Sequence, residues 1–398
     1  MPPFPFSRRI PVSREPNALG RAFSEARASG RRVINLAESN PTRVGAALPA
    51  ERVLPALARP AALSYEPDPR GLSAARSAVA SWYASEGCPV DPRDLFLAAS
   101  TSEAYGWLFK LLADPGDSVL VPKPGYPLFE YLAGLEGVEA VPYPLEYLHP
   151  AGWSIDLDAL ESALKTRRPK AVVLIHPNNP TGSYIGRRER SRVLDLCGES
   201  GAVVIADEVF LPYPLEDPAE PSFAGESEVP CFVLNGFSKL LGLPQMKLGW
   251  IVLAGPARYR EEAAGRLEII ADTYLSTGAP ILNAAGDLLP LAPGFVEGLR
   301  GRLAENLGFL RGSLEGEGSP YRVLRCSGGW TAVLELPRIL PEEELALGLL
   351  REEGIFVHPG YFFDFPREAF LALSLLPRTE DFREGAGRLR AYLDRLLE

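Results

Sequence analysis

The chain has 398 residues, of which 46% are hydrophobic, and it carries a formal net charge of −10. This length exceeds what one small core requires and predicts a globular protein of two packed domains. The acidic balance excludes nucleic acid and an anionic membrane surface as main partners, because both usually require a basic patch, so a small-molecule ligand is expected.

The predicted elements divide the chain into three parts. Residues 1–44 are short and irregular and are expected to pack on the smaller domain as an N-terminal segment. Residues 45–290 alternate helical segments with short apolar runs, which predicts a large α/β domain with a largely parallel sheet between helices. The runs are LFLAA (95–99), SVLVP (118–122), AVVLI (171–175), AVVIA (202–206), CFVLN (231–235) and WIVLA (250–254). Residues 291–398 begin with a long helical pattern and continue with strands and helices, which predicts a smaller α+β domain.

The first run is followed by the polar residues Ser100, Thr101 and Ser102, which begin a predicted helix. Ligands of open α/β sheets bind beyond the carboxyl ends of the strands, so these residues are candidates for a binding site. Their free N–H groups and hydroxyls suit a phosphate group. An ordinary helix cap explains the same residues equally well.

Two later strand ends also carry polar side chains. Asn179 lies in the loop HPNNPTG after the third run, where a plain turn is the alternative explanation. Asp207 ends the fourth run, and a carboxylate there requires a cation or hydrogen bonds, because burying it alone is costly. A helix N-cap is the alternative role for Asp207.

Lysine is rare in this chain, which has six lysines among its 41 basic residues. Two of them, Lys239 and Lys247, lie in the stretch NGFSKLLGLPQMKLGW (235–250). A lysine amine, unlike a guanidinium, can lose its proton and condense with a carbonyl group. Either lysine could form such a Schiff base, and two ordinary surface lysines are the alternative.

These motifs, taken in order, resemble the aspartate aminotransferase superfamily, the fold type I enzymes that use pyridoxal 5′-phosphate (PLP). The resemblance covers about residues 33–380 and implies a sheet of seven strands. It rests on YEPDPRGLSAARSAVASWY, TSEAY, DPGDSVLVPKPGYP, PNNPTG, DEVF, SKLLGLPQMKLGW, GGW and HPGYFF.

The resemblance implies a role for each candidate residue. Lys239 would form the aldimine with PLP and move the substrate α-proton, and Asp207 would pair with the pyridine nitrogen. Asn179 would hydrogen-bond the 3′-oxygen, and Tyr126 would stack on the ring. The phosphate would be held by Thr101, Ser102, Ser238 and Lys247 and by Tyr65 from the neighbouring subunit. A homodimer with shared active sites is therefore expected.

Three residues depart from the family pattern. Phe210 replaces a tyrosine, and Gly236 replaces a serine, and both affect the surroundings of the cofactor. Ala372 replaces the arginine that ordinarily holds the substrate α-carboxylate. We expect another cation to take its place, with Arg70 and then Arg378 as candidates, and Asn40 as a further substrate contact.

The expected activity is that of a PLP-dependent aminotransferase (EC 2.6.1.-). It would move an amino group from an amino acid to a 2-oxo acid by a ping-pong mechanism through Lys239. A β- or γ-lyase on the same scaffold is the main alternative, since both reactions use the same lysine and aspartate. A PLP-binding regulator is disfavoured because no helix-turn-helix segment is predicted, and a nicotinamide enzyme because no G-x-G-x-x-G motif follows a strand.

Cysteine usage and the amino terminus bear on the compartment. The four cysteines lack the spacing of a metal site or a disulfide framework. The first residues, MPPFPFSRRIP, have no apolar signal-peptide core, and no run of about 18 apolar residues predicts a membrane span. We expect a cytoplasmic protein without a bound metal.

Overall fold

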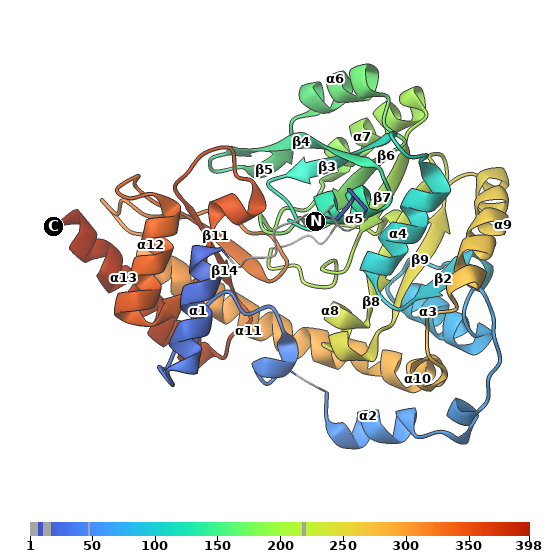
Figure 1. The fold of residues 1–398 in the computed structure, drawn as a ribbon, viewed down its shortest axis with the longest axis horizontal. Coiled ribbons are helices and arrows are strands. Elements are labelled where there is room, and N and C mark those ends of the chain that lie inside the picture. Colours follow the sequence, from blue (N-terminus) through green and yellow to red (C-terminus); the bar gives the residue numbers. More distant parts are fainter. Residues whose placement is uncertain (1–6, 11–16, 47, 217–219) are drawn as a thin grey trace, which may run out of the picture.

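The computed structural model describes residues 7–10, 17–46, 48–216 and 220–398 (Figure 1). Parts of the predicted N-terminal segment, residues 1–6 and 11–16, lie outside the described residues. A large domain surrounds the central sheet, and a smaller domain containing both α1 and α13 lies to its side (Figure 1). The long helix α11 (Ala292–Leu314) runs from the large domain into the smaller one (Figure 1).

The central sheet has the strand order β2-β9-β8-β7-β6-β3-β4-β5. Its strands are β2 (Leu95–Ala98), β3 (Ser118–Lys123), β4 (Glu139–Leu148), β5 (Gly152–Ile155), β6 (Ala171–Ile175), β7 (Val203–Asp207), β8 (Cys231–Gly236) and β9 (Gly249–Ala254). All neighbouring pairs from β8 to β4 are parallel, and β9 is antiparallel to both β2 and β8. The predicted mostly parallel sheet is confirmed, and the hairpin strand β5 adds an eighth strand to the seven expected.

Strand β4 was absent from the strands read from the sequence, because Pro142 and Pro144 interrupt its apolar pattern. Proline cannot donate a ladder hydrogen bond and is tolerated mainly where one edge of a strand is free. Both prolines pair with β3, whereas β5 pairs with β4 only from Leu145 onward. The prolines therefore occupy the part of β4 that has a strand on one side only.

Two layers of helices cover the sheet, which explains why its strands are apolar throughout. Side chains alternate between the two faces of a strand, so Val172 and Leu174 pack in one layer and Val173 and Ile175 in the other. One layer contains α3 (Ser73–Ser85), α6 (Leu157–Arg167), α7 (Arg187–Ser200) and α10 (Ala279–Leu288). The other contains α4 (Thr101–Leu112), α5 (Phe129–Leu135) and α9 (Ala257–Tyr274). Helix α2 (Ala50–Leu57) packs on α10.

The smaller domain is built on an antiparallel sheet of order β10-β11-β14-β13. Its elements are β10 (Arg322–Val323), β11 (Thr331–Glu335), β13 (His358–Pro359), β14 (Phe370–Ser374), α12 (Glu342–Gly348) and α13 (Thr379–Leu397). Helix α1 (Ala18–Ala28) packs against α12, and β1 (Ile34–Asn35) pairs with β12 (Ile355–Phe356). These contacts support, as a proposal, the division into residues 1–44, 45–290 and 291–398.

Candidate active site

Lys239 lies in the short helix α8 (Phe237–Leu240), directly after strand β8. Its amine is 4.9 Å from the ring centroid of Trp330 and 5.5 Å from that of Phe210. Burial lowers the pKa of Lys239 to about 8, and the nearby carboxylate of Asp207 opposes this shift. A larger share of the amine is therefore unprotonated near neutral pH, as a nucleophile requires.

Position 236 requires glycine because strands β8 and β9 approach each other closely there. A Cβ atom at this position would lie 2.8 Å from the Cα of Gly249 and 2.8 Å from the carbonyl oxygen of Leu248. Both atoms belong to the backbone of the neighbouring strand and its lead-in, so they cannot move without shifting β9. The departure from serine at this position thus follows from the spacing of β8 and β9.

Asp207 ends strand β7, next to the strand that leads to Lys239. Its carboxylate accepts hydrogen bonds from the Tyr105 hydroxyl at 3.1 Å and from the Val209 N–H at 3.2 Å. Burial raises the pKa of Asp207 to about 6, while these hydrogen bonds and Lys239 hold it down. A protonated pyridine nitrogen would supply the cation that a buried carboxylate requires.

The N-terminus of α4 forms the third part of the site. Ser100 caps the helix, since its hydroxyl accepts the Glu103 N–H at 3.1 Å. The N–H groups of Thr101 and Ser102 have no acceptor within the helix because they lie in its first turn. A Cβ atom on Gly249 would lie 3.1 Å from the Thr101 nitrogen, so the start of β9 lies against this helix end.

Lys247 lies two residues before Gly249, and Ser238 directly precedes Lys239. Lys247 is exposed and has a left-handed backbone, with φ 55°. Its cation, the hydroxyl of Ser238 and the free end of α4 are groups that suit a phosphate. The structure therefore brings groups that suit a phosphate and the segment of Lys239 to the same end of the sheet.

Asn179 and Tyr126 follow strands β6 and β3, which continue the sheet beyond β7. The Asn179 Oδ1 atom is 3.4 Å from the Thr331 hydroxyl, which links the loop to the smaller domain. Burial and the charge of Asp207 raise the pKa of Tyr126, so its hydroxyl remains protonated and lies within the influence of that carboxylate. The ring of Tyr126 is packed edge-to-face with Phe129, at 5.7 Å between centroids.

Two aromatic residues after β7 have distinct surroundings. The buried Tyr213 donates its hydroxyl hydrogen to the Lys239 carbonyl oxygen at 2.6 Å. Phe210 packs edge-to-face with Trp330 and has no hydroxyl to donate. The Tyr213 hydroxyl is therefore already hydrogen-bonded to the backbone of α8 and does not replace the tyrosine missing at position 210.

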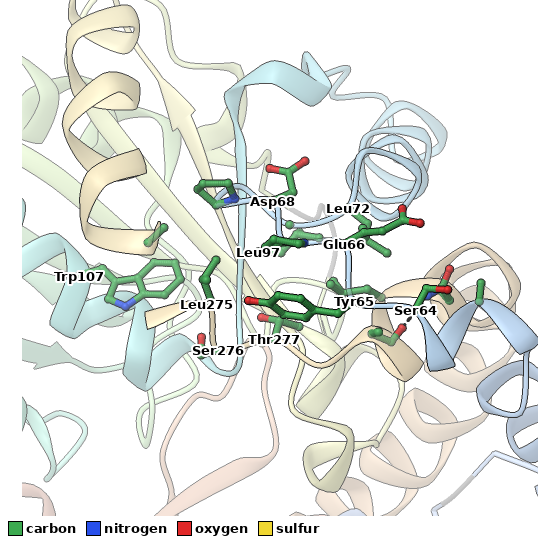
Figure 2. A pocket seen from close by; sticks show the side chains of 18 residues that line it. Ser64, Tyr65, Glu66, Asp68, Leu72, Leu97, Trp107, Leu275, Ser276 and Thr277 are labelled. Carbon is green, nitrogen blue, oxygen red and sulfur yellow. Dashed lines mark hydrogen bonds between the residues drawn. The ribbon is translucent and has the colours of Figure 1, made fainter. Parts of the chain in front are cut away.

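Tyr65 is 79% exposed, and no contact joins it to Lys239 among the residues that the structure describes. It lines a cavity of about 100 Å³ together with Trp107, Leu275 and Ser276 (Figure 2). The Ser276 hydroxyl donates to Glu103 Oε2 at 2.7 Å, so this cavity adjoins the first turn of α4.

The three predicted substrate contacts are not brought to Lys239 by any contact within the described part of the chain. The Arg70 guanidinium pairs with Glu268 at 3.0 Å, donates to the Arg93 carbonyl oxygen at 2.7 Å and lies 5.2 Å from the Phe96 ring centroid. Arg378 packs against the backbone of Gly45, where a Cβ atom would lie 3.1 Å from its Nη2.

Asn40 caps a short 3-10 helix (Pro41–Arg43) by accepting the Thr42 N–H at 3.1 Å. The side chains of Arg70 and Asn40 are therefore already bound to other groups of the chain. Arg378 retains a guanidinium without an ion pair among the described residues.

Ala372 is buried in strand β14, where it belongs to an apolar cluster. Its neighbours in this cluster are Leu324, Val333, Phe363, Phe365 and Phe370. Sequence reasoning did not assign a role to Trp330, whose ring contacts the Lys239 amine, although it lies in the quoted motif GGW. It also assigned none to His358, which the smaller sheet places beside Ala372.

The fold and this set of side chains define a PLP-binding enzyme of fold type I. The sequence pattern of the family "Aminotransferase class I and II" matches residues 31–389. The chain belongs to this family and is a PLP-dependent aminotransferase, which confirms the expectation from the sequence.

Relatives and solved structures agree with this assignment. The chain is 30% identical to an alanine aminotransferase of Mycobacterium tuberculosis over 387 residues, covering 92% of this chain and 86% of the relative. It is 26% identical to a glutamate-pyruvate aminotransferase of Escherichia coli over 381 residues, covering 92% and 91%. The solved structure of an alanine aminotransferase from Pyrococcus furiosus has the same fold, with a TM-score of 0.88, 23% identity and coverage of 98% and 100%.

Two further observations concern membranes and metals. None of the helices in the described residues is both long and apolar enough to cross a membrane. The described residues contain no group of three or more histidine, cysteine, aspartate or glutamate side chains that could hold a metal ion.

Proposed function

We propose that the protein moves an amino group between an amino acid and a 2-oxo acid by a ping-pong mechanism in which Lys239 is the reacting amine. The observation that carries this proposal is the Lys239 amine itself. It is buried beside Trp330 and Phe210, burial lowers its pKa to about 8, and Asp207 lies close enough to influence that pKa.

The residues present fit PLP, which draws electrons away from the substrate carbon next to the amine. In the proposal, Asp207 would accept a hydrogen bond from the protonated pyridine nitrogen, and Asn179 would donate one to the 3′-oxygen. Tyr126 would lie against the ring, and Lys239 would remove and return the proton at the substrate α-carbon. Thr101, Ser102, Ser238 and Lys247 would hold the phosphate.

A homodimer with shared sites is part of the proposal. Tyr65 is exposed, and the segments before α3 and around α9 carry further exposed apolar side chains. These are Leu54, Leu63, Ile269, Tyr274 and Leu275. Exposed apolar patches of this kind mark protein–protein contacts, and Tyr65 would then reach the phosphate in the other subunit. We also propose a cytoplasmic location.

The names of the relatives suggest the first substrates to test, which are alanine and glutamate as donors and pyruvate as an acceptor. The purified holoenzyme would be mixed with a panel of amino acids while the cofactor spectrum is recorded. A transaminase converts the cofactor to its amine form and releases one 2-oxo acid per site, and added pyruvate restores the original spectrum.

A β- or γ-lyase remains the second candidate, because it would use Lys239 and Asp207 in the same positions. Continued release of ammonia and a 2-oxo acid, with the aldehyde form of the cofactor retained, would identify a lyase instead. A panel in which no amino acid changes the spectrum would contradict both reactions.

A further inference from the structure

The smaller sheet places a histidine directly beside the position of the missing arginine. His358 of β13 pairs with Ala372 of β14 in antiparallel register. Residues directly opposite in such a pair project from the same face of the sheet, with Cβ atoms about 4.5–5.5 Å apart. The imidazole of His358 therefore projects from the face on which an arginine at position 372 would lie.

His358 has no polar partner in the described part of the chain. Its ring is packed against Phe356, Phe362 and Phe363, with centroids 5.6 Å, 5.4 Å and 6.0 Å away. Neither ring nitrogen forms a hydrogen bond within the described residues, although the side chain is only partly exposed. An imidazole in such apolar surroundings gains from a ligand that accepts its N–H hydrogen.

Two sets of contacts connect the face of the smaller sheet that carries His358 to the candidate active site. The Phe363 carbonyl oxygen accepts the Gly125 N–H at 3.1 Å, one residue before Tyr126. On the other side, Ser374 pairs with Thr331, whose hydroxyl is 3.4 Å from Asn179 Oδ1. His358 therefore lies between the loop that carries Tyr126 and the strand pair that contacts Asn179.

We propose that His358 binds the substrate α-carboxylate in place of the arginine absent at position 372. This inference rests on the proposed function, since it requires an amino acid substrate. An imidazole N–H donated to a carboxylate is a charge-assisted hydrogen bond, and the apolar walls strengthen it by keeping the local dielectric low. Arg70 is a weaker candidate because its guanidinium is already paired.

Among the described residues, no charged group on the neighbouring elements forms an ion pair with His358 in the free protein. Lys123 pairs with Asp364 at 3.0 Å, and Glu342 accepts the N–H groups of Tyr361, Ala369 and Phe370. The charged or titratable residues on the elements around His358 are Arg21, Glu25 and Arg27 on α1, Lys123 on β3, Glu342, Glu343 and Glu344 on α12, and Tyr361 and Asp364 after β13. Burial alone lowers the pKa of His358 to about 4.

The imidazole is therefore neutral at pH 7 in the free protein. A bound carboxylate raises the pKa of its imidazole partner, so binding takes up a proton above about pH 4. Affinity for a carboxylate then falls as the pH rises and levels off above the pKa of the complex. A permanently charged guanidinium would give no such dependence near neutral pH.

The test compares two probes on the holoenzyme by the change in cofactor absorbance. One probe is 2-methylalanine, which has the amine and carboxylate of alanine but no α-hydrogen to lose. The other is isopropylamine, the same molecule without the carboxylate. We expect the wild-type protein to prefer 2-methylalanine, and His358→Leu to reduce that preference roughly 10- to 100-fold.

Matched variants separate the role of the carboxylate partner from that of a structural residue. His358→Arg should keep the preference and lose the part of its pH dependence that His358 supplies, and His358→Gln should keep part of the preference. His149→Leu, a change of another of the three histidines, should behave as the wild type. Retained cofactor absorbance and circular dichroism would show that each variant is folded.

A second measurement does not depend on turnover. The imidazole signals of the labelled holoenzyme can be followed by NMR and assigned with the histidine variants, since the chain has three histidines. Saturation with 2-methylalanine should raise the pKa of His358, whereas isopropylamine should leave it unchanged.

Three results would overturn the inference while leaving aminotransferase activity intact. They are equal binding of the two probes by the wild type, an unchanged preference in His358→Leu, and a preference that is lost in Arg378→Ala instead. Failure of every amino acid to convert the cofactor would instead contradict the proposed function itself.

Discussion

Phe210 leaves the expected 3′-oxygen of the cofactor with one hydrogen-bond donor fewer than a tyrosine would supply. Tyr213 cannot compensate, because its hydroxyl is bound to the Lys239 carbonyl oxygen. We predict that Phe210→Tyr lowers the pKa of the cofactor-bound Lys239 nitrogen, by an amount corresponding to about 1 kcal/mol. The pKa is measured by spectral titration of the holoenzyme, with Tyr213→Phe as the control. An unchanged or higher pKa would show that another donor already serves the 3′-oxygen.

Arg70 has the contacts of a structural residue. We predict that Arg70→Ala lowers the free energy of unfolding by about 1–2 kcal/mol, because it loses the Arg93 carbonyl contact, the Phe96 ring contact and a partly exposed ion pair. Its kcat/KM should stay within about twofold of the wild type. Urea unfolding and steady-state kinetics measure the two effects.

Arg93→Ala is the matched control for Arg70→Ala, since the Arg93 side chain is exposed and pairs with Asp91 on the surface. Its stability should change by less than about 0.5 kcal/mol. If Arg70→Ala reduced kcat/KM about a hundredfold at unchanged stability, Arg70 would bind the substrate carboxylate as first expected.

The close approach of β8 and β9 positions both α8 and the end of α4. We predict that Gly236→Ser destabilises the fold by about 1–3 kcal/mol, because its Cβ would meet backbone atoms at 2.8 Å. It should also weaken cofactor retention, since β9 lies against the Thr101 nitrogen. Urea unfolding and dialysis against buffer without PLP measure the two effects.

Gly265→Ser in α9 is the control for Gly236→Ser, because no atom lies within 4 Å of a Cβ at that position. It should leave stability and cofactor retention near the wild-type values. Equal behaviour of the two variants would show that the contact between β8 and β9 is not tight in solution.

In the proposed dimer, the exposed apolar side chains before α3 and around α9 mark where a second copy would bind. We predict that Leu63→Asp, at a side chain that is 93% exposed, lowers the molecular mass measured by sedimentation from dimer to monomer. Cofactor retention should fall with it, because Tyr65 of the partner would be lost from each site.

Leu148→Asp is the matched control for the dimer prediction, since this side chain is also exposed, at 58%, but lies at the end of β4 in the hairpin with β5. It should leave the mass unchanged. A wild-type protein that sediments as a monomer would contradict the shared-site proposal.

The amino-acid pattern was enough to predict six of the strands and to name the candidates for the proposed cofactor site. Six apolar runs were long and regular enough to predict strands. The neighbouring strands β3, β6, β7 and β8 are parallel, so their carboxyl ends meet at the same edge of the sheet. Asp207, Asn179 and Lys239 could therefore be identified from their places directly after strands, before any packing was known.

Properties that depend on segments distant in sequence follow from the three-dimensional packing and could not be predicted from local patterns. The prolines of β4 concealed that strand, because their tolerance depends on which edge has a neighbour. Whether Arg70 is free depended on Glu268, nearly two hundred residues away, and the pKa of Lys239 depended on burial by both domains. The pairing of His358 with Ala372 depends on the register of β13 against β14. Strand β13 has only two residues, which is too short for its sequence to predict that register.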